Sequence, residues 1–204
     1  MSGAAPIVGA GDATGAAVAR AFARKGLTAC VSRRATNADK LEAPAQSIRD
    51  DGQLARAIAG DARDGDDVVA MFESIERDVG PLEVVVFNIG TNVNFPITQT
   101  TARVPRQRGT VIFPRATASL RCGSGYAAFA GAKASLRMLA QSMAREPRPQ
   151  NIHVAHSIID GPIDTDFIAS GIPDIDAARA GNAILSPHNI ARNYVMVHRP
   201  ARNA

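Results

Sequence analysis

Three glycines near the start of the chain, Gly9, Gly11 and Gly15, have the spacing of a phosphate-binding turn. They follow a short apolar run, Pro6 to Val8, that predicts a buried strand, and an alanine-rich segment with helical spacing begins directly after them. Glycine lets the chain turn sharply and leaves room for a phosphate at the helix N-terminus, where free N–H groups hold an anion. An ordinary strand-to-helix turn is the alternative interpretation. The residues expected to line the site are Gly9, Gly11, Asp12, Ala13, Thr14 and Gly15.

Charged side chains follow the next two predicted strands. Arg33 and Arg34 come after the strand at Leu27 to Ser32, and Asp61 comes after the strand at Leu54 to Ala59. In a parallel dinucleotide-binding sheet the end of the second strand faces the adenine ribose, where an acidic residue binds the 2′-hydroxyl of NAD and arginine suits the 2′-phosphate of NADP. We therefore predict that NADP(H) is preferred over NAD(H), with Asp61 near the adenine amino group. Two surface arginines opening a loop are the alternative.

The elements that must position these residues alternate between apolar runs and helical spacing. A helix-like segment from Asn37 to Asp51 is expected to break at Pro44, and a second helix runs through Val68 and Ile75. The valine-rich run Leu82 to Phe87 predicts a fourth strand, buried on both faces. Three strand–helix units with short connections predict a doubly wound parallel α/β sheet that binds its ligand at the carboxyl ends of the strands.

The alternation fails after the fourth strand. Residues 91–108 contain two prolines and show no apolar stripe of helical period, and Gly109 to Phe113 predicts a fifth strand. Eighteen residues are enough for an extended crossover but not for a covering helix with two loops. One face of the sheet is therefore expected to lack a helix. A long helix from Gly125 to Glu146, a sixth strand from Ile152 to Ile159 and a helix opening at Ser186-Pro187 complete the chain.

Composition bounds the class of protein. The 204 residues suit one domain, 1–204, and no apolar run has membrane-spanning length. The first five residues show no signal peptide, and Cys30 and Cys122 have no metal-ligand spacing, so we expect reduced thiols in the cytoplasm and no metal. The formal net charge is +4, but the basic residues are scattered. The only cluster, Arg103, Arg106, Arg108 and Arg115, is interpreted as a solvated face.

The order of these features resembles the short-chain dehydrogenase/reductase family over nearly the whole chain. The family's Gly-x-x-x-Gly-x-Gly turn maps onto Gly9, Ala13 and Gly15, with alanine in place of the middle glycine. Its Asn-Asn-Ala-Gly maps onto 87–90, keeping Asn88 and Gly90, and its Pro-Gly turn corresponds to Asp160-Gly161. The resemblance implies a three-layer Rossmann-like fold, here expected to lack the helix after the fourth strand and the last strand. The residues it adds to the cofactor site are Asn88, Gly90, Lys133, Gly161, Ile163 and Thr165.

The catalytic positions depart from the family pattern. The family's Tyr-x-x-x-Lys corresponds to Phe129 and Lys133, and its serine, thirteen residues before the tyrosine, corresponds to Ala116. Lys133 is the retained residue, which the resemblance implies binds the cofactor ribose. Phenylalanine has no proton to give. Three neighbours remain candidates for replacing the missing groups: Thr117 or Ser119 to orient a carbonyl, and Tyr126, which shares a helix face with Lys133 but lies about 4.5 Å along the axis from the family's tyrosine position.

We therefore predict an NAD(P)(H)-dependent oxidoreductase of the short-chain type that acts on a small carbonyl or alcohol substrate. Its activity is expected to be weakened or lost because Phe129 replaces the tyrosine. A non-catalytic NADP-binding or scaffolding protein is the alternative. A nucleic-acid-binding domain using the arginine cluster is a further alternative, which a steep salt dependence of duplex binding would support. We expect no nucleic-acid or membrane partner. A homo-oligomer is a possible assembly, although the two missing elements would change surfaces through which the family's members associate.

Overall fold

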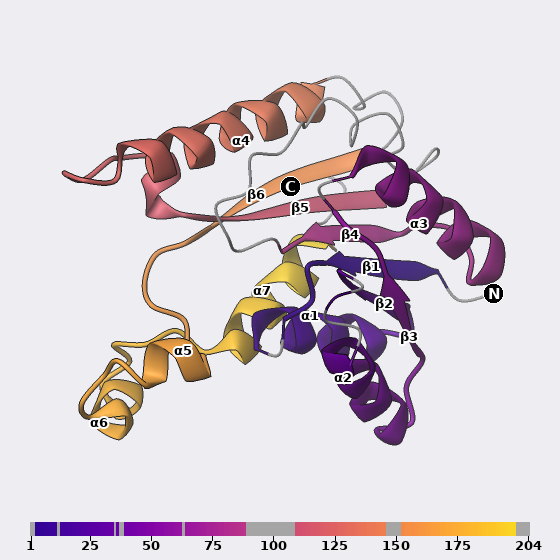
Figure 1. Cartoon of the computed structure of the whole chain (residues 1–204), viewed down its shortest axis with the longest axis horizontal. Coiled ribbons are helices and arrows are strands. Elements are labelled where there is room, and N and C mark those ends of the chain that lie inside the picture. The colour runs from indigo at the N-terminus through magenta and orange to yellow at the C-terminus, as the bar shows by residue number, and fades with distance from the viewer. Residues whose placement is uncertain are drawn as a thin grey trace.

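A parallel sheet of six strands organises the part of the chain that the structure describes (Figure 1). The computed structural model describes residues 3–11, 13–34, 36, 39–62, 64–88, 109–145 and 152–198. The strand order is β3-β2-β1-β4-β5-β6, so the chain winds outward from β1 in both directions. The strands are β1 (Ala4–Val8), β2 (Thr28–Arg33), β3 (Ala55–Ala59), β4 (Val84–Phe87), β5 (Gly109–Ala116) and β6 (Ile152–Ile159). This is the predicted Rossmann-like α/β fold.

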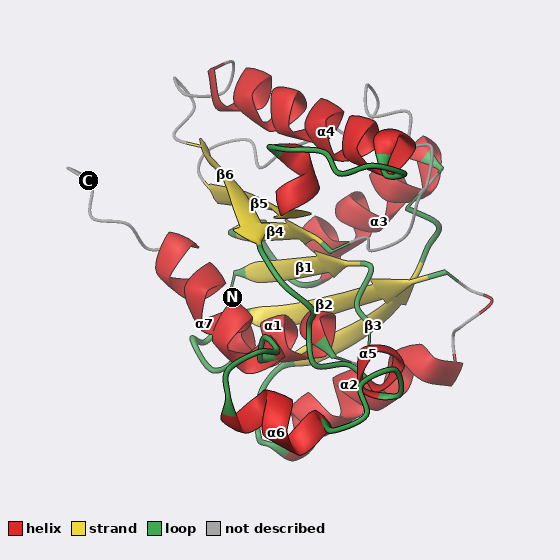
Figure 2. Cartoon of the chain, turned by 90° about the vertical axis from the view of Figure 1, so that its left-hand side faces the viewer, coloured by secondary structure: helices red, strands yellow, loops and turns green. Residues whose placement is uncertain are grey.

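Helices cover both faces of the sheet and make three layers (Figure 2). One face carries α1 (Thr14–Ala23), α2 (Asp39–Asp50) and α7 (Pro187–His198), and the other carries α3 (Gly65–Asp78) and α4 (Ala127–Arg145). A one-turn 3₁₀ helix, η3 (Thr117–Ser119), joins β5 to the loop before α4. Two short helices, α5 (Asp166–Ala169) and α6 (Ile175–Ala180), extend away from the sheet beside α7 (Figure 1).

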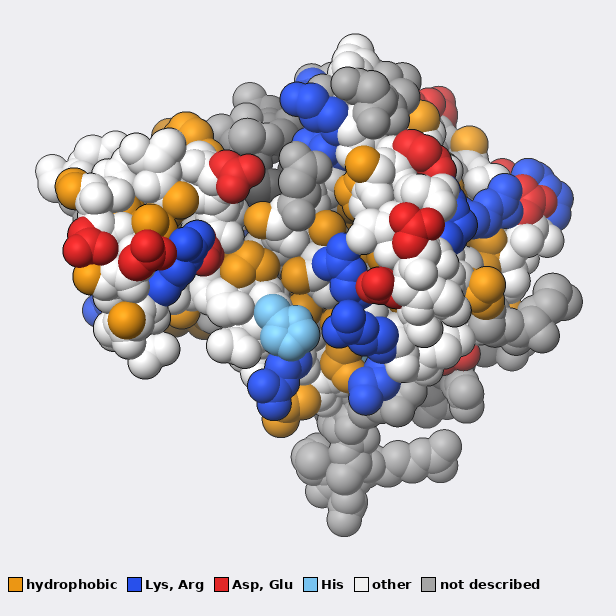
Figure 3. Space-filling view, turned by 90° about the horizontal axis from the view of Figure 1, so that it is seen from below, with side chains coloured by type: hydrophobic (Ala, Val, Ile, Leu, Met, Phe, Trp, Pro, Cys, Tyr) orange, Lys and Arg blue, Asp and Glu red, His pale blue; other side chains and the backbone are white. Residues whose placement is uncertain are grey.

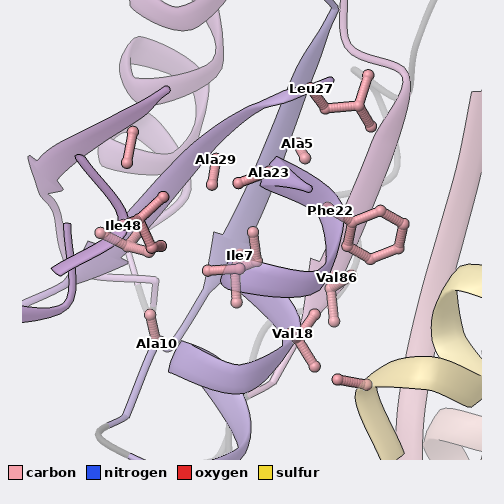
Figure 4. Close-up of a cluster of buried hydrophobic side chains, with 14 of the residues drawn as sticks. Ala5, Ile7, Ala10, Val18, Phe22, Ala23, Leu27, Ala29, Ile48 and Val86 are labelled. Atoms are coloured by element: carbon pink, nitrogen blue, oxygen red, sulfur yellow. The ribbon is translucent and has the colours of Figure 1, made fainter. Parts of the chain in front are cut away.

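The core under α1 forms because every second residue of β1 and β2 points to the same face of the sheet, where small and branched side chains pack together. Alanines on α1 let the helix approach closely, and Phe22 fills the space between α1 and the sheet (Figure 4). The His198 ring packs edge-on against Phe22, with centroids 5.6 Å apart, and its Nδ1 lies 3.1 Å from the Thr110 hydroxyl. These contacts fix α7 against both α1 and β5.

The core on the opposite face contains a row of aromatic rings. Phe72 of α3 meets Phe87 of β4 edge-on, and Phe87 stacks on Phe113 of β5 with centroids 5.6 Å apart. Such pairs contribute about 0.5–1.5 kcal/mol beyond the area they bury. This row fixes the carboxyl ends of β4 and β5 beside each other.

The structure corrects two expected boundaries. β5 continues to Ala116 instead of ending at Phe113, because beyond Ile112 it pairs with β6 alone and the missing N–H of Pro114 costs no hydrogen bond to β4. α2 is not broken at Pro44 but contains it. The proline removes the helical bond to the carbonyl four residues earlier, and Arg33 donates to that carbonyl, on Lys40, over 3.5 Å.

Several sequence expectations fall on residues outside those described. The crossover at 91–108 and the missing helix after β4 belong to this group, as does the end of the chain after residue 198. The helices α5 and α6 were not predicted. Within the described residues, no helix is long and apolar enough to cross a membrane, and no group of three His, Cys, Asp or Glu side chains could hold a metal ion.

Candidate functional site

The glycine turn between β1 and α1 is held tightly against the sheet. Gly9 adopts a positive φ of 81°, and the N–H groups of Gly9 and Ala10 donate to the Ser32 carbonyl at the end of β2. The Asn88 side chain, just past β4, donates to the Gly9 carbonyl over 3.3 Å. Asn88 thereby links the end of β4 to the turn, a contact that the sequence analysis did not predict.

The remaining two glycines play different parts. A Cβ on Gly15 would lie 2.6 Å from the Ala10 Cα, so only glycine lets α1 start this close to the turn. A Cβ on Gly11 would have no atom within 4 Å. Gly11 is therefore not required by packing within the described chain, and the space beside it is available to a ligand.

The N-terminus of α1 has no side-chain cap in the described structure. Its N-cap residue is Ala13, the first turn holds no acidic residue, and Thr14 is buried. The first backbone N–H groups of a helix have no partner within the helix, and the helix dipole places partial positive charge there. With the open space beside Gly11, this helix start fits the pyrophosphate of a dinucleotide. Asp12, predicted to line the same turn, is outside the described residues.

The ends of β2 and β3 lie side by side. Arg33 is paired in register with Ala59, and the Arg33 carbonyl accepts from Gly60 N–H over 2.9 Å. Arg33 is half-buried with its guanidinium near the Lys40 carbonyl, whereas Arg34 is exposed. The backbone N–H of Asp61 donates to Asp67 at the start of α3. The three predicted adenosine-side residues therefore converge on one edge of the sheet.

The end of β6 approaches the end of β5. The Thr117 hydroxyl donates to the Asp160 carboxylate, and Arg121 lies 4.0 Å from that carboxylate. Asp160 was not predicted as a site residue. Because Thr117 already donates to a carboxylate, its hydroxyl proton is not directed at a substrate in this arrangement.

The segment after β6 is built by local backbone bonds. Ile163 bridges to Leu185 and packs on the core below α1. Gly161 adopts a φ of 151°, and a Cβ on it would lie 3.3 Å from the Leu185 side chain. The Thr165 hydroxyl accepts from Ile168 N–H over 3.2 Å and so caps α5. Thr165 thus has a structural function in addition to the predicted cofactor contact.

The predicted catalytic helix α4 brings Phe129 and Lys133 together. Lys133 Nζ lies 5.1 Å from the centroid of the Phe129 ring, so the lysine extends toward the position where the family's tyrosine would stand. Burial lowers the pKa of Lys133, and the positive charge of Arg115 lowers it further. Tyr126 lies just before the first turn of α4, with 62% of its surface exposed.

Two buried residues near α4 carry polar atoms without a hydrogen-bond partner. Ser119 is 3% exposed and its Oγ has no partner in the described structure. Arg115 is 6% exposed and its Nε also has none. The sequence interpretation placed Arg115 on a solvated face with Arg103, Arg106 and Arg108; for Arg115 this was wrong, because the longer β5 turns it toward the core. The other three arginines, like Gly90, lie outside the described residues.

Comparison with known proteins gives the family. Residues 4–105, half of the chain, match the family model described as short chain dehydrogenase, and residues 92–194 match the model described as Enoyl-(Acyl carrier protein) reductase. A crystal structure of a short-chain dehydrogenase from Rhodopseudomonas palustris is 36% identical, with 99% of this chain and 94% of that chain covered and a TM-score of 0.74. The chain belongs to the short-chain dehydrogenase family.

More distant members of the short-chain dehydrogenase family share the fold. A short-chain oxidoreductase from Pseudomonas aeruginosa PAO1, solved with NADPH and described as containing an atypical catalytic center, has a TM-score of 0.79 at 19% identity over 97% of this chain and 90% of that chain. Among curated relatives, gluconate 5-dehydrogenase from Gluconobacter oxydans is 28% identical over 72% of this chain. This match covers 66% of the relative, just under two thirds of its length. The family's use of NAD or NADP agrees with the glycine turn described above.

Proposed function

We propose that this short-chain dehydrogenase is an NADP(H)-dependent oxidoreductase that acts on a carbonyl or alcohol group of a small molecule. The observation that carries the proposal is the glycine turn. Gly15 brings a helix start without a side-chain cap against the ends of β1 and β4, and a Cβ on Gly11 would meet no atom of the described residues within 4 Å. A dinucleotide phosphate has both the charge and the shape for this position.

The residues that would hold the cofactor follow from this placement. Gly9, Gly11, Ala13, Thr14 and Gly15 face the pyrophosphate, and Asp12 belongs to the same turn by sequence. Arg33 and Arg34 would bind the 2′-phosphate and Asp61 the adenine, which supports NADP over NAD. Asn88, Gly90, Gly161, Ile163, Thr165 and Lys133 would line the nicotinamide half. The bound cofactor supplies or accepts the hydride.

The chain's own contribution is orientation and proton handling. Ser119 has a buried hydroxyl without a partner in the described structure, so it is better placed than Thr117 to donate to a substrate oxygen. Lys133 carries the positive charge that stabilises a developing oxyanion. Phe129 supplies no proton, and Tyr126 would have to turn inward from solvent to do so. We therefore expect slow turnover.

Curated relatives give a direction for the substrate class. Besides gluconate 5-dehydrogenase, they include a 2,3-dihydro-2,3-dihydroxybenzoate dehydrogenase from Bacillus subtilis, 24% identical over 79% of this chain and 70% of its own length. Both names denote oxidation of a hydroxyl group on a molecule that also carries a carboxylate. For the present chain we propose a hydroxy or keto compound of similar size. We place the protein in the cytoplasm, and a homo-oligomer is consistent with the family.

A second candidate function, a non-catalytic NADP-binding protein, is favoured by one observation: Phe129 occupies the tyrosine position. Reduction of a panel of keto acids and neutral ketones, followed by NADPH absorbance, separates the two candidates. The variant Phe129→Tyr adds a hydroxyl to the ring that Lys133 already approaches, and Phe129→Leu is the control that removes the ring without adding a donor.

A positioned general acid typically contributes about 10²–10⁴-fold in rate. If the native chain is a weak enzyme, it turns over a substrate and Phe129→Tyr raises kcat by about that factor while Phe129→Leu does not. If only Phe129→Tyr turns over, the native chain is a binder. No turnover in any variant, with cofactor binding intact, would refute the oxidoreductase proposal.

A further inference from the structure

Arg115 is a buried cation that the described structure leaves without an anion. It lies on β5, one residue before Ala116, and only 6% of its surface is exposed. Its Nε is buried and unpaired, and burial lowers its pKa to about 10, so it remains charged at neutral pH. The guanidinium carbon stands 6.0 Å from the centroid of the Phe113 ring. That ring face attracts a cation but accepts no strong hydrogen bond.

No neighbouring carboxylate of the described chain neutralises Arg115. The ion pairs of the described residues do not include it, and Asp160, at the end of the adjacent strand, accepts from Thr117 and lies near Arg121. The segment that precedes β5 in sequence, 89–108, contains three arginines and no aspartate or glutamate. Burying a charge is costly unless it is paired, so such a site favours an anion from outside the chain.

Other groups near Arg115 make the same region more positive. The charge of Arg115 lowers the pKa of Lys133 in α4 and that of His156, which neighbours Phe113 in register. The neighbour that acts on Arg115 itself is Tyr194 of α7, which raises the Arg115 pKa against the larger effect of burial. The His156 Nε2 is buried without a partner in the described structure, and burial together with the charges of Arg115 and Arg137 lowers the pKa of His156. Arg137 of α4 is a third cation of this group, and its Nε, like Ser119 Oγ in η3, is buried without a hydrogen-bond partner in the described structure.

We propose that Arg115 and Lys133 bind the oxyanion group, carboxylate or phosphate, of a small ligand between β5 and α4. Arginine suits this task because its planar fork donates two parallel hydrogen bonds to either group. The identification of that ligand as the substrate rests on the proposed function, because Lys133 belongs to the proposed reaction site. The binding itself does not.

Thermal unfolding without cofactor tests the binding, followed by circular dichroism because the chain has no tryptophan. The probes are sodium benzoate for the carboxylate, inorganic phosphate for the phosphate, and sodium chloride at equal ionic strength for simple screening. The variants are Arg115→Met and the matched control Arg121→Met, whose side chain is 79% exposed. A ligand at about a hundred times its Kd should raise Tm by about 5–10 °C in a domain of this size.

The proposal predicts that benzoate or phosphate raises Tm of the native chain and of Arg121→Met beyond the chloride control, and that Arg115→Met loses this rise. An equal rise in Arg115→Met, or no rise in the native chain, overturns it. If Arg115→Met does not fold, the buried Nε–H signal of Arg115 in ¹⁵N NMR of the native chain takes its place: it must shift with the effective probe and not with chloride.

The two proposals fail separately. If the native chain binds the anion at Arg115 but does not bind NADP⁺, only the cofactor site is refuted. If it binds NADP⁺ but no anion at Arg115, only the Arg115 site is refuted.

Discussion

Replacing Gly15 with alanine tests how the cofactor turn is built. The new Cβ would lie 2.6 Å from Ala10 Cα, 3.0 Å from its carbonyl carbon and 3.2 Å from Asn88 Nδ2. The two nearest atoms are backbone, so α1 or the turn has to move. Overpacking costs about 1–3 kcal/mol, and contact with rigid backbone atoms places this substitution in the upper part of that range, about 2–3 kcal/mol. The better helix propensity of alanine returns about 1 kcal/mol.

The expected net loss in the free energy of unfolding is therefore about 1–2 kcal/mol. For a domain of this length each kcal/mol corresponds to about 2–4 °C, so Tm should fall by about 2–8 °C. The shift also displaces Asn88 from the Gly9 carbonyl, and NADP⁺ affinity should fall with it. Circular dichroism gives Tm, and calorimetric titration gives the affinity.

Gly11→Ala is the matched control. Its Cβ meets no atom within 4 Å among the residues that the structure describes, so its Tm should equal that of the native chain. It would nevertheless occupy the space proposed for the pyrophosphate, so NADP⁺ binding should weaken. A native Tm for Gly15→Ala would refute the packing argument. Native NADP⁺ affinity for Gly11→Ala would show that the cofactor does not approach this turn.

Three further predictions concern single side chains. Asn88→Ala removes one partly buried hydrogen bond, and urea denaturation should show a loss of about 0.5–1.5 kcal/mol; an unchanged midpoint would contradict the bond. The pKa of Lys133 is lower in the folded chain than the ordinary 10.5, so the unfolded chain binds more protons between the two values and this residue makes the fold more stable as pH rises through that range. Removing the charge in Arg115→Met should raise the Lys133 pKa, measured by NMR titration of methylated lysines, and an unmoved pKa would contradict their interaction. Burial raises the pKa of Cys30 to about 12, so at pH near 8 a thiol reagent should modify the exposed Cys122 first and reach Cys30 only on unfolding; rapid labelling of both would contradict the core.

The sequence predicted the fold because its signals are local. Apolar runs of strand length alternate with helical spacing, and the six strands were placed within a few residues of their observed bounds. The prediction of a break at Pro44 was wrong because it relied on the general rule that proline interrupts a helix. In α2 the carbonyl that loses its helical partner, on Lys40, gains Arg33 as a donor, a contact across 7 positions that no local pattern shows.

The site was less predictable because its details depend on pairing between distant segments. Arg115 was grouped with three sequence neighbours, whereas its burial follows from β5 continuing past Pro114 along β6. Continuing the strand's two-residue alternation past Pro114 places Arg115 on the same face as the buried Val111 and Phe113, and would have predicted its burial. The Thr117–Asp160 contact joins two strand ends that are 43 residues apart. The caps of α5 and α6, Thr165 and Asp174, are recognisable types, but helices of 4 and 6 residues show too little periodicity to be found.

Charge on the surface bears on the nucleic-acid alternative. On the face seen in Figure 3, lysine and arginine side chains gather over the middle, while the α5–α6 lobe carries acidic and basic side chains together. In that lobe Arg179 forms a two-fold contact with Asp164, at 2.8 and 3.0 Å, and a further bond to Asp176. Arg179 is therefore engaged by carboxylates and not available to phosphates, whereas the nucleic-acid alternative stays a matter for the salt dependence of duplex binding.

The most direct test of the central claim is calorimetric titration of the native chain with NADP⁺ and, separately, with NAD⁺. We expect both to bind at the glycine turn and NADP⁺ to bind more tightly, because we assign Arg33 and Arg34 to its 2′-phosphate. Tighter binding of NAD⁺ would contradict the assignment of these arginines. Binding of neither would contradict the cofactor site itself, and with it the proposed oxidoreductase function.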